Sequence, residues 1–370
     1  MTTADASGWT ARRALLKRAA LAASLPAAAT VLGGALPGTA HAAAGTARAA
    51  DDGPELPDFA PVPSQAFGPA LNEKGYYVGR IGGALYWVTD GSYQAMFLAT
   101  REGVVLVDAP PTIGHNLQRA IDDVTGPLGL PNRVTHLVYS HSHADHIGAA
   151  GLWDKNVERI AHVENRRLLR RDADPERPVP TTVFEDRLTV EVGGERLELA
   201  YHGPNHSPDN IYVYAPDYRT LMLVDVVYPG WVPFKELAVS QDIPGWIKAH
   251  DTALSYPWRT LVGGHLGRLG HRSDAETQKQ YMDDLTASTH AALTGLDPTP
   301  YFAKYGPSGN AWAIFKTYLA AVAEHAAAPV TDKYLGVLAA ADVFTVDNAA
   351  ALLESLRIDS DVLGPFGIHA

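Results

Sequence analysis

Short apolar runs separated by glycine-containing turns fill much of the first 270 residues, and they predict β-strands. Turn signals such as Gly82-Gly83 and Asp90-Gly91 separate neighbouring runs, as in hairpins. The strand-like runs form two series: 76–81, 84–89, 95–99 and 104–107, then 188–192, 197–200, 211–214 and 221–224. Between the series, residues 116–124 place apolar side chains at helical spacing. Strand clusters followed by helices, twice over, predict two sheets packed face to face with helices outside, which is an α+β fold.

Two segments flank this strand-rich region and differ from it. Residues 43–70 are rich in Ala, Asp, Gly and Pro, and they predict a flexible linker. Residues 273–370 contain alanine-rich stretches at 311–324 and 348–356 that predict helices, and they hold no cluster of potential ligands. We interpret 273–370 as a helical C-terminal extension that packs on the sandwich or forms the surface of a homo-oligomer.

The N-terminus carries the features of an export signal. Arg12-Arg13 precede a moderately apolar stretch at 19–36, and Ala40-His41-Ala42 offers a cleavage site with small residues. The arginine pair and its surroundings resemble the twin-arginine motif, so we expect 1–42 to be a twin-arginine signal peptide. The protein would then be secreted or periplasmic, with no membrane span after cleavage. A basic amphipathic helix or a membrane anchor is the alternative, although prolines interrupt the apolar stretch.

Composition narrows the classes of function. The absence of cysteine removes disulfides, thiol nucleophiles and cysteine-ligated metal sites. Residues 1–42 hold four of the 30 basic and one of the 41 acidic residues, so the remainder carries a net charge of −14. Such a surface repels polyanions, which disfavours a nucleic-acid partner and leaves a small-molecule substrate as the expected partner.

The densest group of potential metal ligands is His141-Ser-His143-Ala-Asp145-His146, which follows the apolar run 137–139. The run predicts a buried strand, so the ligands lie on the turn where that strand ends. Alternate residues His141 and His143 can face one ion, while Asp145 and His146 turn towards a second. Imidazole nitrogens and a carboxylate suit zinc, and this combination in this context predicts a catalytic metal site.

This hexad resembles the signature of the metallo-β-lactamase superfamily, and the resemblance covers roughly residues 75–270. The family's remaining ligands are matched in order by His206, Asp225 and His265, each beside a predicted strand. The resemblance implies a four-layer αββα sandwich as the catalytic domain at 71–272, with the metals at one sheet edge. It also implies two Zn²⁺ ions per chain, one held by His141, His143 and His206, one by Asp145, His146 and His265, with Asp225 as the bridge.

The same resemblance implies a hydrolase in which a metal-bound hydroxide attacks a carbonyl. We expect Asp145 and Tyr228 to be catalytic. Tyr228 stands three residues after Asp225, an offset at which this chain resembles quorum-quenching lactonases in carrying a tyrosine that contacts the substrate carbonyl. The lysine that many β-lactamases place there for the substrate carboxylate is missing. We therefore favour a cyclic or activated carbonyl of the lactone type, with Tyr228 donating to the developing oxyanion.

Other functions stay open at this point. The segment from His206 to Asn210 resembles the turn of zinc β-lactamases, so a zinc β-lactamase is one alternative. A second is a non-catalytic zinc protein that keeps the scaffold for binding. A third is a sulfur dioxygenase of the same fold, which would hold a single iron with His141, His143, His206 and Asp225.

Two further groups of residues have open roles. Trp231, Phe234 and Trp246 line an apolar pocket near the metals or belong to the core. Independently of this, Tyr228 either contacts the substrate carbonyl or is only part of an aromatic turn at 228–231. The remaining histidines show no paired spacing and are interpreted as structural or exposed. Among them His202 is the first candidate for a further ligand, because it lies close to His206 in sequence.

Overall fold

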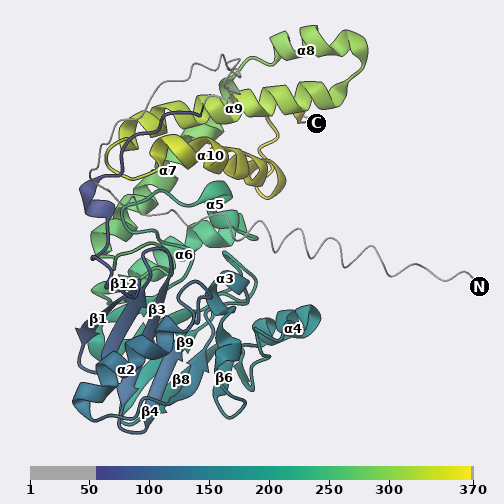
Figure 1. The fold of residues 1–370 in the computed structure, drawn as a ribbon. Helices are drawn as coiled ribbons and strands as arrows, with labels where there is room; N and C mark the ends of the chain where they lie inside the picture. Colours follow the sequence, from purple (N-terminus) through teal and green to yellow (C-terminus); the bar gives the residue numbers. More distant parts are fainter. Residues whose placement is uncertain (1–55, 368–370) are drawn as a thin grey trace, which may run out of the picture. The chain divides into compact units, whose positions relative to one another are not determined.

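Two β-sheets form the centre of the computed structural model, which describes residues 56–367 (Figure 1). The first sheet has seven strands in the order β1 (Tyr77–Gly82), β2 (Leu85–Thr89), β3 (Gln94–Thr100), β4 (Gly103–Val107), β5 (Val134–Val138), β6 (Glu158–His162) and β7 (Thr182–Phe184). The second has five strands in the order β12 (Thr260–Val262), β11 (Thr220–Met222), β10 (Tyr212–Ala215), β9 (Glu195–Ala200) and β8 (Arg187–Val192). Strands β1 to β4 pair antiparallel, whereas β4 to β7 pair parallel, as do β11 and β12.

The α-helices lie between and after these strands. They are α2 (Asn116–Leu128), α3 (Ala144–Ile147), α4 (Val163–Asp172), α5 (Lys235–Val239), α6 (Ile243–Ser255), α7 (Arg272–Gly295), α8 (Thr299–Tyr305), α9 (Ala311–Tyr334) and α10 (Ala341–Ile358). Short 3-10 turns are η1 (Ser64–Ala66), η2 (Ala150–Leu152), η3 (Pro216–Tyr218), η4 (Gly306–Ser308) and η5 (Gly364–Phe366). Within residues 56–367, no helix is both long and apolar enough to cross a membrane.

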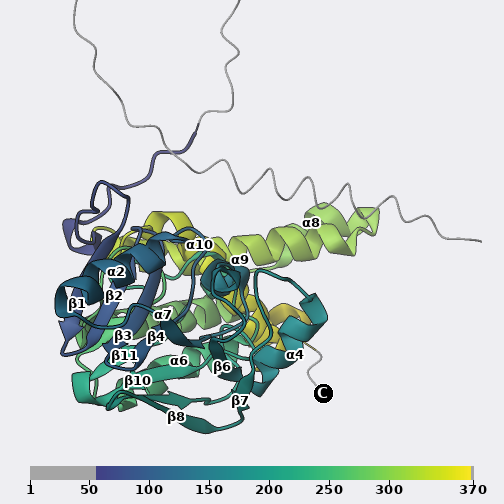
Figure 2. The same cartoon turned by 60° about the horizontal axis from the view of Figure 1, so that its bottom comes forward.

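The two sheets pack face to face through alternate residues of their strands. On β3, Met96 belongs to the same buried cluster as Val213 of β10, between the sheets. Its neighbour Phe97 points the other way and shares a buried cluster with Ile121 of α2, which lies over the first sheet (Figure 2). Both faces of β3 are therefore buried, which explains why its sequence is an apolar run without polar alternation.

Helices α6 and α7 cover the second sheet. Tyr212 of β10 and Leu221 of β11 share a buried cluster with Trp246 of α6 and Leu285 of α7. The layers therefore run from α2 through the first sheet and the second sheet to α6 and α7. This arrangement confirms the predicted αββα sandwich.

The C-terminal helices continue the same core. Tyr318 and Val322 of α9 and Leu352 of α10 belong to the cluster that also holds Leu221 of the second sheet. In Figure 1, α7, α9 and α10 stack beyond the α6 side of the sandwich. The predicted helical C-terminal region is thus confirmed, and its apolar residues complete the layer that covers the second sheet.

Part of the predicted flexible linker, 43–70, is packed against the body of the protein. The backbone N–H of Ala60 donates to Asp342 Oδ2 at 2.6 Å, and the Trp231 indole donates to the Ala66 carbonyl at 3.3 Å. Gly68 lies against Gly267 so closely that a Cβ there would be 1.7 Å from the Gly267 carbonyl oxygen. A glycine and a buried alanine thus allow a close backbone approach within 57–70 that composition does not reveal. Residues 1–42 and 43–55 lie outside the described residues.

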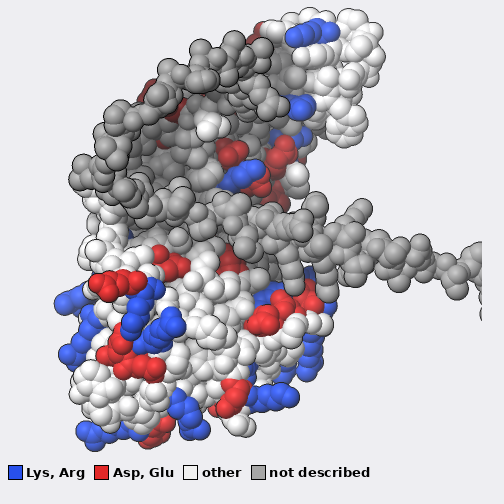
Figure 3. All heavy atoms as spheres, in the orientation of Figure 1, with Lys and Arg blue, Asp and Glu red and all other residues white. Residues whose placement is uncertain are grey.

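The surface of the sandwich carries both signs of charge. Figure 3 shows Lys and Arg side chains interspersed with Asp and Glu over the described part of the face in view.

Helix α5 is not a right-handed helix. Four consecutive residues, 236–239, have positive φ between 53° and 63°, and none of them is glycine. Such a left-handed turn costs roughly 1–2 kcal/mol per residue, so tertiary contacts must hold it. Asn348 of α10 provides two of them: its Oδ1 accepts from the Leu237 N–H at 2.8 Å, and its Nδ2 donates to the Pro233 carbonyl at 3.0 Å.

Asn348→Leu should lower the free energy of unfolding by about 2–4 kcal/mol, because it leaves the buried N–H of Leu237 and the carbonyl of Pro233 without partners. Urea denaturation followed by circular dichroism measures this change. Val346→Ala on the same helix is the control, because Val346 is exposed and its loss should cost less than about 0.5 kcal/mol. Equal stability of Asn348→Leu and wild type would mean that Asn348 does not hold the turn.

Candidate metal centre

All seven predicted ligand residues lie in loops or short helices beside strand ends. His141 to His146 follow β5 and enter α3, and His206 lies in the loop between β9 and β10. Asp225 and His265 each come three residues after β11 and β12, which are parallel neighbours and so deliver both residues to one sheet edge. The Ile211 N–H donates to the Ser140 carbonyl at 3.0 Å, which joins the start of β10 to the loop after β5. Both sheets therefore contribute to one site.

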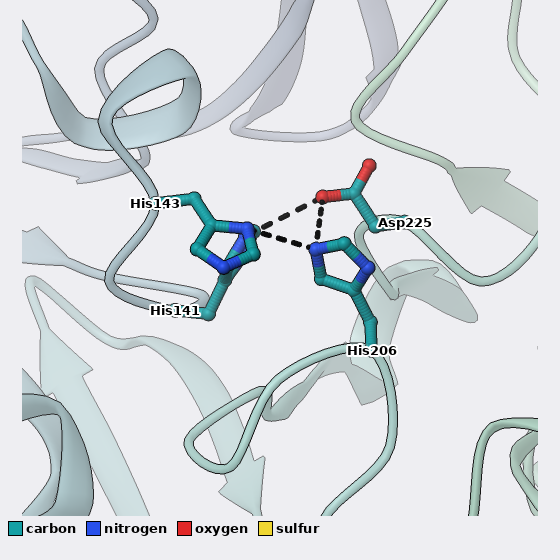
Figure 4. A group of neighbouring side chains, drawn as sticks. All are labelled: His141, His143, His206 and Asp225. Carbon is teal, nitrogen blue, oxygen red and sulfur yellow. Dashed lines mark hydrogen bonds and ion pairs between the residues drawn. The ribbon is translucent and has the colours of Figure 1, made fainter. Parts of the chain in front are cut away.

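The first group of ligand atoms consists of His141, His143, His206 and Asp225 (Figure 4). Asp225 Oδ2 lies 3.4 Å from His141 Nε2 and 3.1 Å from His206 Nε2. His206 Nε2 lies 2.9 Å from His143 Nδ1. The group comes from three separate loops and converges on one point.

The second group consists of Asp145, His146 and His265. His146 Nε2 lies 3.0 Å from His265 Nε2, and Asp145 Oδ2 lies 3.6 Å from His146 Nε2. Asp225 reaches this group as well, with Oδ2 3.0 Å from His146 Nε2 and Oδ1 2.7 Å from His265 Nε2. The structure therefore brings together all seven residues, with Asp225 between the two groups.

The donor set fits a divalent cation. His141 Nε2 is completely buried and has no hydrogen-bond partner, although it faces the other ligand atoms, so a cation there would supply the missing partner. Burial, followed by the neighbouring imidazoles, holds the pKa of His141 well below its usual range and lowers that of His143 to about 4. Both rings are therefore neutral at physiological pH, which is the form that binds metal. Imidazole nitrogens with carboxylate oxygens are typical zinc ligands.

Asp225 stays ionised although it is buried. Burial alone would raise its pKa, but the surrounding histidines hold it well below its usual range. Two hydrogen bonds fix the backbone of Asp225. Its N–H donates to the Gly263 carbonyl at 3.2 Å, directly after β12, and its carbonyl accepts from the Trp246 indole of α6 at 2.8 Å. A charged oxygen donor is thus held in place between the two groups.

Gln278 of α7 supports the segment after Asp225. Its Oε1 accepts from the Tyr228 N–H at 2.8 Å, and its Nε2 donates to the Val226 carbonyl at 2.5 Å. Its Nε2 also lies 2.8 Å from His250 Nε2 of α6. Sequence analysis missed Gln278, because a glutamine in a helix gives no signal that it is buried.

A buried carboxylate also ties the histidine loops together. Asp209 Oδ1 accepts from Ser207 Oγ at 2.8 Å and from Ser142 Oγ at 3.3 Å, and its Oδ2 accepts from Asn165 Nδ2 at 3.0 Å. Ser142 lies between His141 and His143, and Ser207 follows His206. Asp209 thus couples the positions of the two loops.

Two phenols stand beside the cluster. The Tyr228 hydroxyl donates to Asp225 Oδ1 at 3.1 Å, and burial, followed by this carboxylate, raises the pKa of Tyr228 well above its usual range. The Tyr93 hydroxyl donates to Asp145 Oδ2 at 3.4 Å, and burial followed by Asp145 raises the pKa of Tyr93 as well. Both phenols keep their protons at neutral pH and can act as donors. Sequence analysis identified Tyr228 but missed Tyr93, which lies in the turn between two strands of the first sheet.

A cavity of about 510 Å³ opens beside these groups. Its lining comprises Ser92, Tyr93, His143, Asp145, His206, Asp225, Tyr228, Trp231, Val232, Phe234, Ala238, Val239, His265, Leu266, Ala340 and Phe344, without a lysine or arginine among these described residues. Trp231 and Phe234 line the cavity, as the pocket interpretation of the sequence expects. Trp246 does not: it is fully buried in the core and holds the Asp225 carbonyl.

The chain is similar to several known proteins. A family model described as the metallo-beta-lactamase superfamily matches residues 88–287. The 2,4-dinitroanisole O-demethylase subunit alpha of Nocardioides sp. (strain JS1661) is 28% identical over 243 residues, which cover 64% of this chain and 70% of that protein. The metallo-beta-lactamase IND-1 of Chryseobacterium indologenes is 28% identical over 132 residues, 35% of this chain and 52% of that protein. The solved metallo-beta-lactamase from Pontibacter korlensis matches with a TM-score of 0.47 and 22% identity, over 55% of this chain and 97% of its own. The segment matched by the family model contains all seven residues of the centre.

His206→Ala should weaken the binding of a divalent cation, with Zn²⁺ as the probe, because it removes an imidazole that contacts both His143 and Asp225. The loss should exceed the roughly 10–100-fold that is typical when a residue that only supports a ligand is removed. Competition with a chelator of known affinity measures this change. His202→Ala is the matched control, because His202 Nε2 lies 2.7 Å from the Tyr256 hydroxyl and outside both ligand groups. Equal zinc affinity of the two variants would contradict the assignment of the centre.

Proposed function

The chain belongs to the metallo-β-lactamase superfamily, and on this premise we propose that it is a hydrolase with two zinc ions that opens a cyclic or activated carbonyl, with a lactone-type ester favoured. The observation that carries the proposal is the cluster of seven donor residues beside an apolar cavity with two protonated phenols. The cluster supplies what metal-assisted hydrolysis requires, and the cavity offers space for an uncharged organic substrate.

We assign the residues to two ions by their grouping. His141, His143 and His206 would hold one zinc, Asp145, His146 and His265 the other, and Asp225, which contacts both groups, would bridge them. Such a pair of ions, when bound, activates water as a nucleophile at neutral pH and polarises the substrate carbonyl. Asp145 is half-exposed on the cavity side, where it can also orient a water molecule by accepting a hydrogen bond.

Tyr228 is proposed to stabilise the negative charge that develops on the substrate oxygen. Its raised pKa keeps the proton on the phenol, and its hydroxyl lies at the boundary between the donor cluster and the cavity. A donor in such a position typically contributes about 3–4 kcal/mol to transition-state stabilisation. Tyr93, on the Asp145 side of the cavity, is a second candidate donor.

The charges around the cavity favour a lactone over a β-lactam. A β-lactam antibiotic carries a carboxylate, and the cavity lining, as far as residues 56–367 form it, offers no lysine or arginine to bind it. The second ligand group argues against the single-iron dioxygenase, because that site would leave Asp145, His146 and His265 without a role. The completeness of both groups likewise argues against a non-catalytic protein.

A second candidate function is cleavage of an electron-poor aryl ether. The relative that covers 64% of this chain is called an O-demethylase of 2,4-dinitroanisole, an aryl methyl ether. The aromatic cavity wall, with Trp231, Phe234 and Phe344, suits a planar ring as well as an alkyl chain. Assaying lactones beside dinitroanisole separates the two candidates.

Tyr228→Phe should lower kcat for a lactone by about 100–1000-fold while zinc content stays unchanged, because it removes a hydrogen-bond donor without removing a ligand. Steady-state kinetics together with elemental analysis provides both readouts. Tyr256→Phe is the matched control, because its hydroxyl contacts His202 and lies outside the cavity. If Tyr228→Phe is silent and β-lactams are turned over faster than lactones, the lactonase assignment is wrong.

We further propose export through the twin-arginine route, on the basis of Arg12-Arg13 ahead of an apolar stretch. Changing both residues to lysine should retain the protein inside the cell, because the route depends on the arginine pair. Cell fractionation and immunoblotting measure this, with Arg18→Lys as a control outside the pair. Undiminished export of the double variant would exclude this route.

A further inference from the structure

One wall of the cavity is built by residues outside the metal ligands. Ala238 and Val239 belong to the left-handed turn of α5, and Phe234 directly precedes α5. Phe344 lies in the first turns of α10, and Ala340 directly precedes that helix. The rings of Phe234 and Phe344 pack edge to face, with centroids 5.1 Å apart. The C-terminal helices therefore contribute directly to the cavity.

This wall presents apolar side chains to the open cavity. Phe234 is 50% exposed and Val239 is 53% exposed, although large apolar side chains are usually buried. Both belong to the cavity lining, so part of their apolar surface borders the space where a ligand would lie. Covering this surface with an apolar group would remove it from water, which is favourable.

The wall is held rigidly by backbone and side-chain hydrogen bonds. The Val232 N–H donates to the Ala339 carbonyl at 3.1 Å, and the Ala339 N–H donates to the Gly230 carbonyl at 2.9 Å. Asn348 joins the two ends of the turn through Pro233 and Leu237. A wall that is fixed before binding loses little conformational entropy when a ligand arrives.

Among the described residues that form this wall, none carries a charge that could pair with a charged substituent. The two charged residues of the turn, Lys235 and Glu236, lie 3.5 Å apart, pair with each other, and do not line the cavity. The lining carries the carboxylates Asp145 and Asp225 on the side of the metal centre. These two carboxylates would be bound to cations, so they bear on the metal centre and not on the wall. The described residues of the wall itself offer no charged partner, so the wall suits a substituent that is uncharged as well as apolar.

We propose that Phe234 and Phe344 are specificity-determining residues that bind the uncharged apolar substituent of the substrate, while its reacting carbonyl lies at the metal centre. This inference rests on the proposed hydrolysis and specifies its substrate class, a neutral ester or lactone with an extended hydrocarbon group. Each methylene that the wall buries should raise kcat/KM by roughly two- to fourfold.

The test uses the zinc-loaded protein and the series γ-butyrolactone, γ-octalactone and γ-dodecalactone. In wild type, kcat/KM should rise along the series. Phe234→Ala and Phe344→Ala should lower the ratio of kcat/KM for γ-dodecalactone over γ-butyrolactone by at least about tenfold, because each removes a ring from the wall. If Phe344→Ala does not fold, Phe234→Ala alone decides the test, because Phe234 is half-exposed and its truncation perturbs the core less.

Two matched controls test whether position matters. Val346→Ala lies on the same helix, α10, and Phe302→Ala removes a phenylalanine of similar exposure (44%) on α8. Both residues lie outside the cavity lining, so neither variant should change the ratio. A ratio that is unchanged in the Phe234 and Phe344 variants, or lowered equally in the controls, overturns the inference.

A binding measurement separates this inference from the proposed reaction. The γ-lactam analogue of γ-dodecalactone resists hydrolysis, and calorimetry gives its Kd for wild type and variants. One possible result is that no lactone is hydrolysed, but wild type binds the lactam at least about tenfold more tightly than the two phenylalanine variants do. The role of Phe234 and Phe344 in binding is then supported, and the proposed lactonase function is wrong. If lactones are hydrolysed without any dependence on chain length, the inference about Phe234 and Phe344 is wrong and the proposed lactonase function is supported. Tighter binding of a lactam with a terminal carboxylate on its chain also overturns the inference.

Discussion

The buried carboxylate of Asp225 is the group on which the rest of the site depends. Four histidines, His141, His146, His206 and His265, place a ring nitrogen within 3.4 Å of its oxygens. Burying a charge is costly unless partners surround it. Here the partners are imidazole nitrogens that lie close to one another, and a bound cation would accept their lone pairs. The sandwich meets this demand because strands of both sheets end at the same edge, where each loop contributes one or more ligands.

The C-terminal helices help to position residues of this site. Gln278 of α7 holds the backbone on either side of Val227. Asn348 of α10 holds the turn that carries Phe234. The same helices supply the buried cluster that covers the second sheet. Stability and site geometry are thus coupled, because the contacts that close the core also position the carboxylate and the cavity wall.

Two segments show how tertiary contacts override local preference. Residues 235–238, Lys-Glu-Leu-Ala, are good formers of right-handed helix, yet residues 236–239 adopt positive φ. Residues 57–70 have the composition of a linker, yet they pack through Ala60, Ala66 and Gly68. In both cases hydrogen bonds to distant residues select a conformation that the local sequence does not favour.

The sequence by itself indicated most strands of the sandwich and the candidate ligands, but it did not indicate β6, β7 or α6. Apolar runs predicted the buried strands. The hexad from His141 to His146, with His206, Asp225 and His265, predicted the centre. These residues could be found in the sequence because each lies directly after or before an apolar run that marks a strand. Only the tertiary structure decided which residues support that centre and shape its cavity. Asn348 lies 111 residues from Leu237, and Gln278 lies 50 from Tyr228. A polar residue in a helix looks solvated in sequence, and its burial depends on how the helices pack.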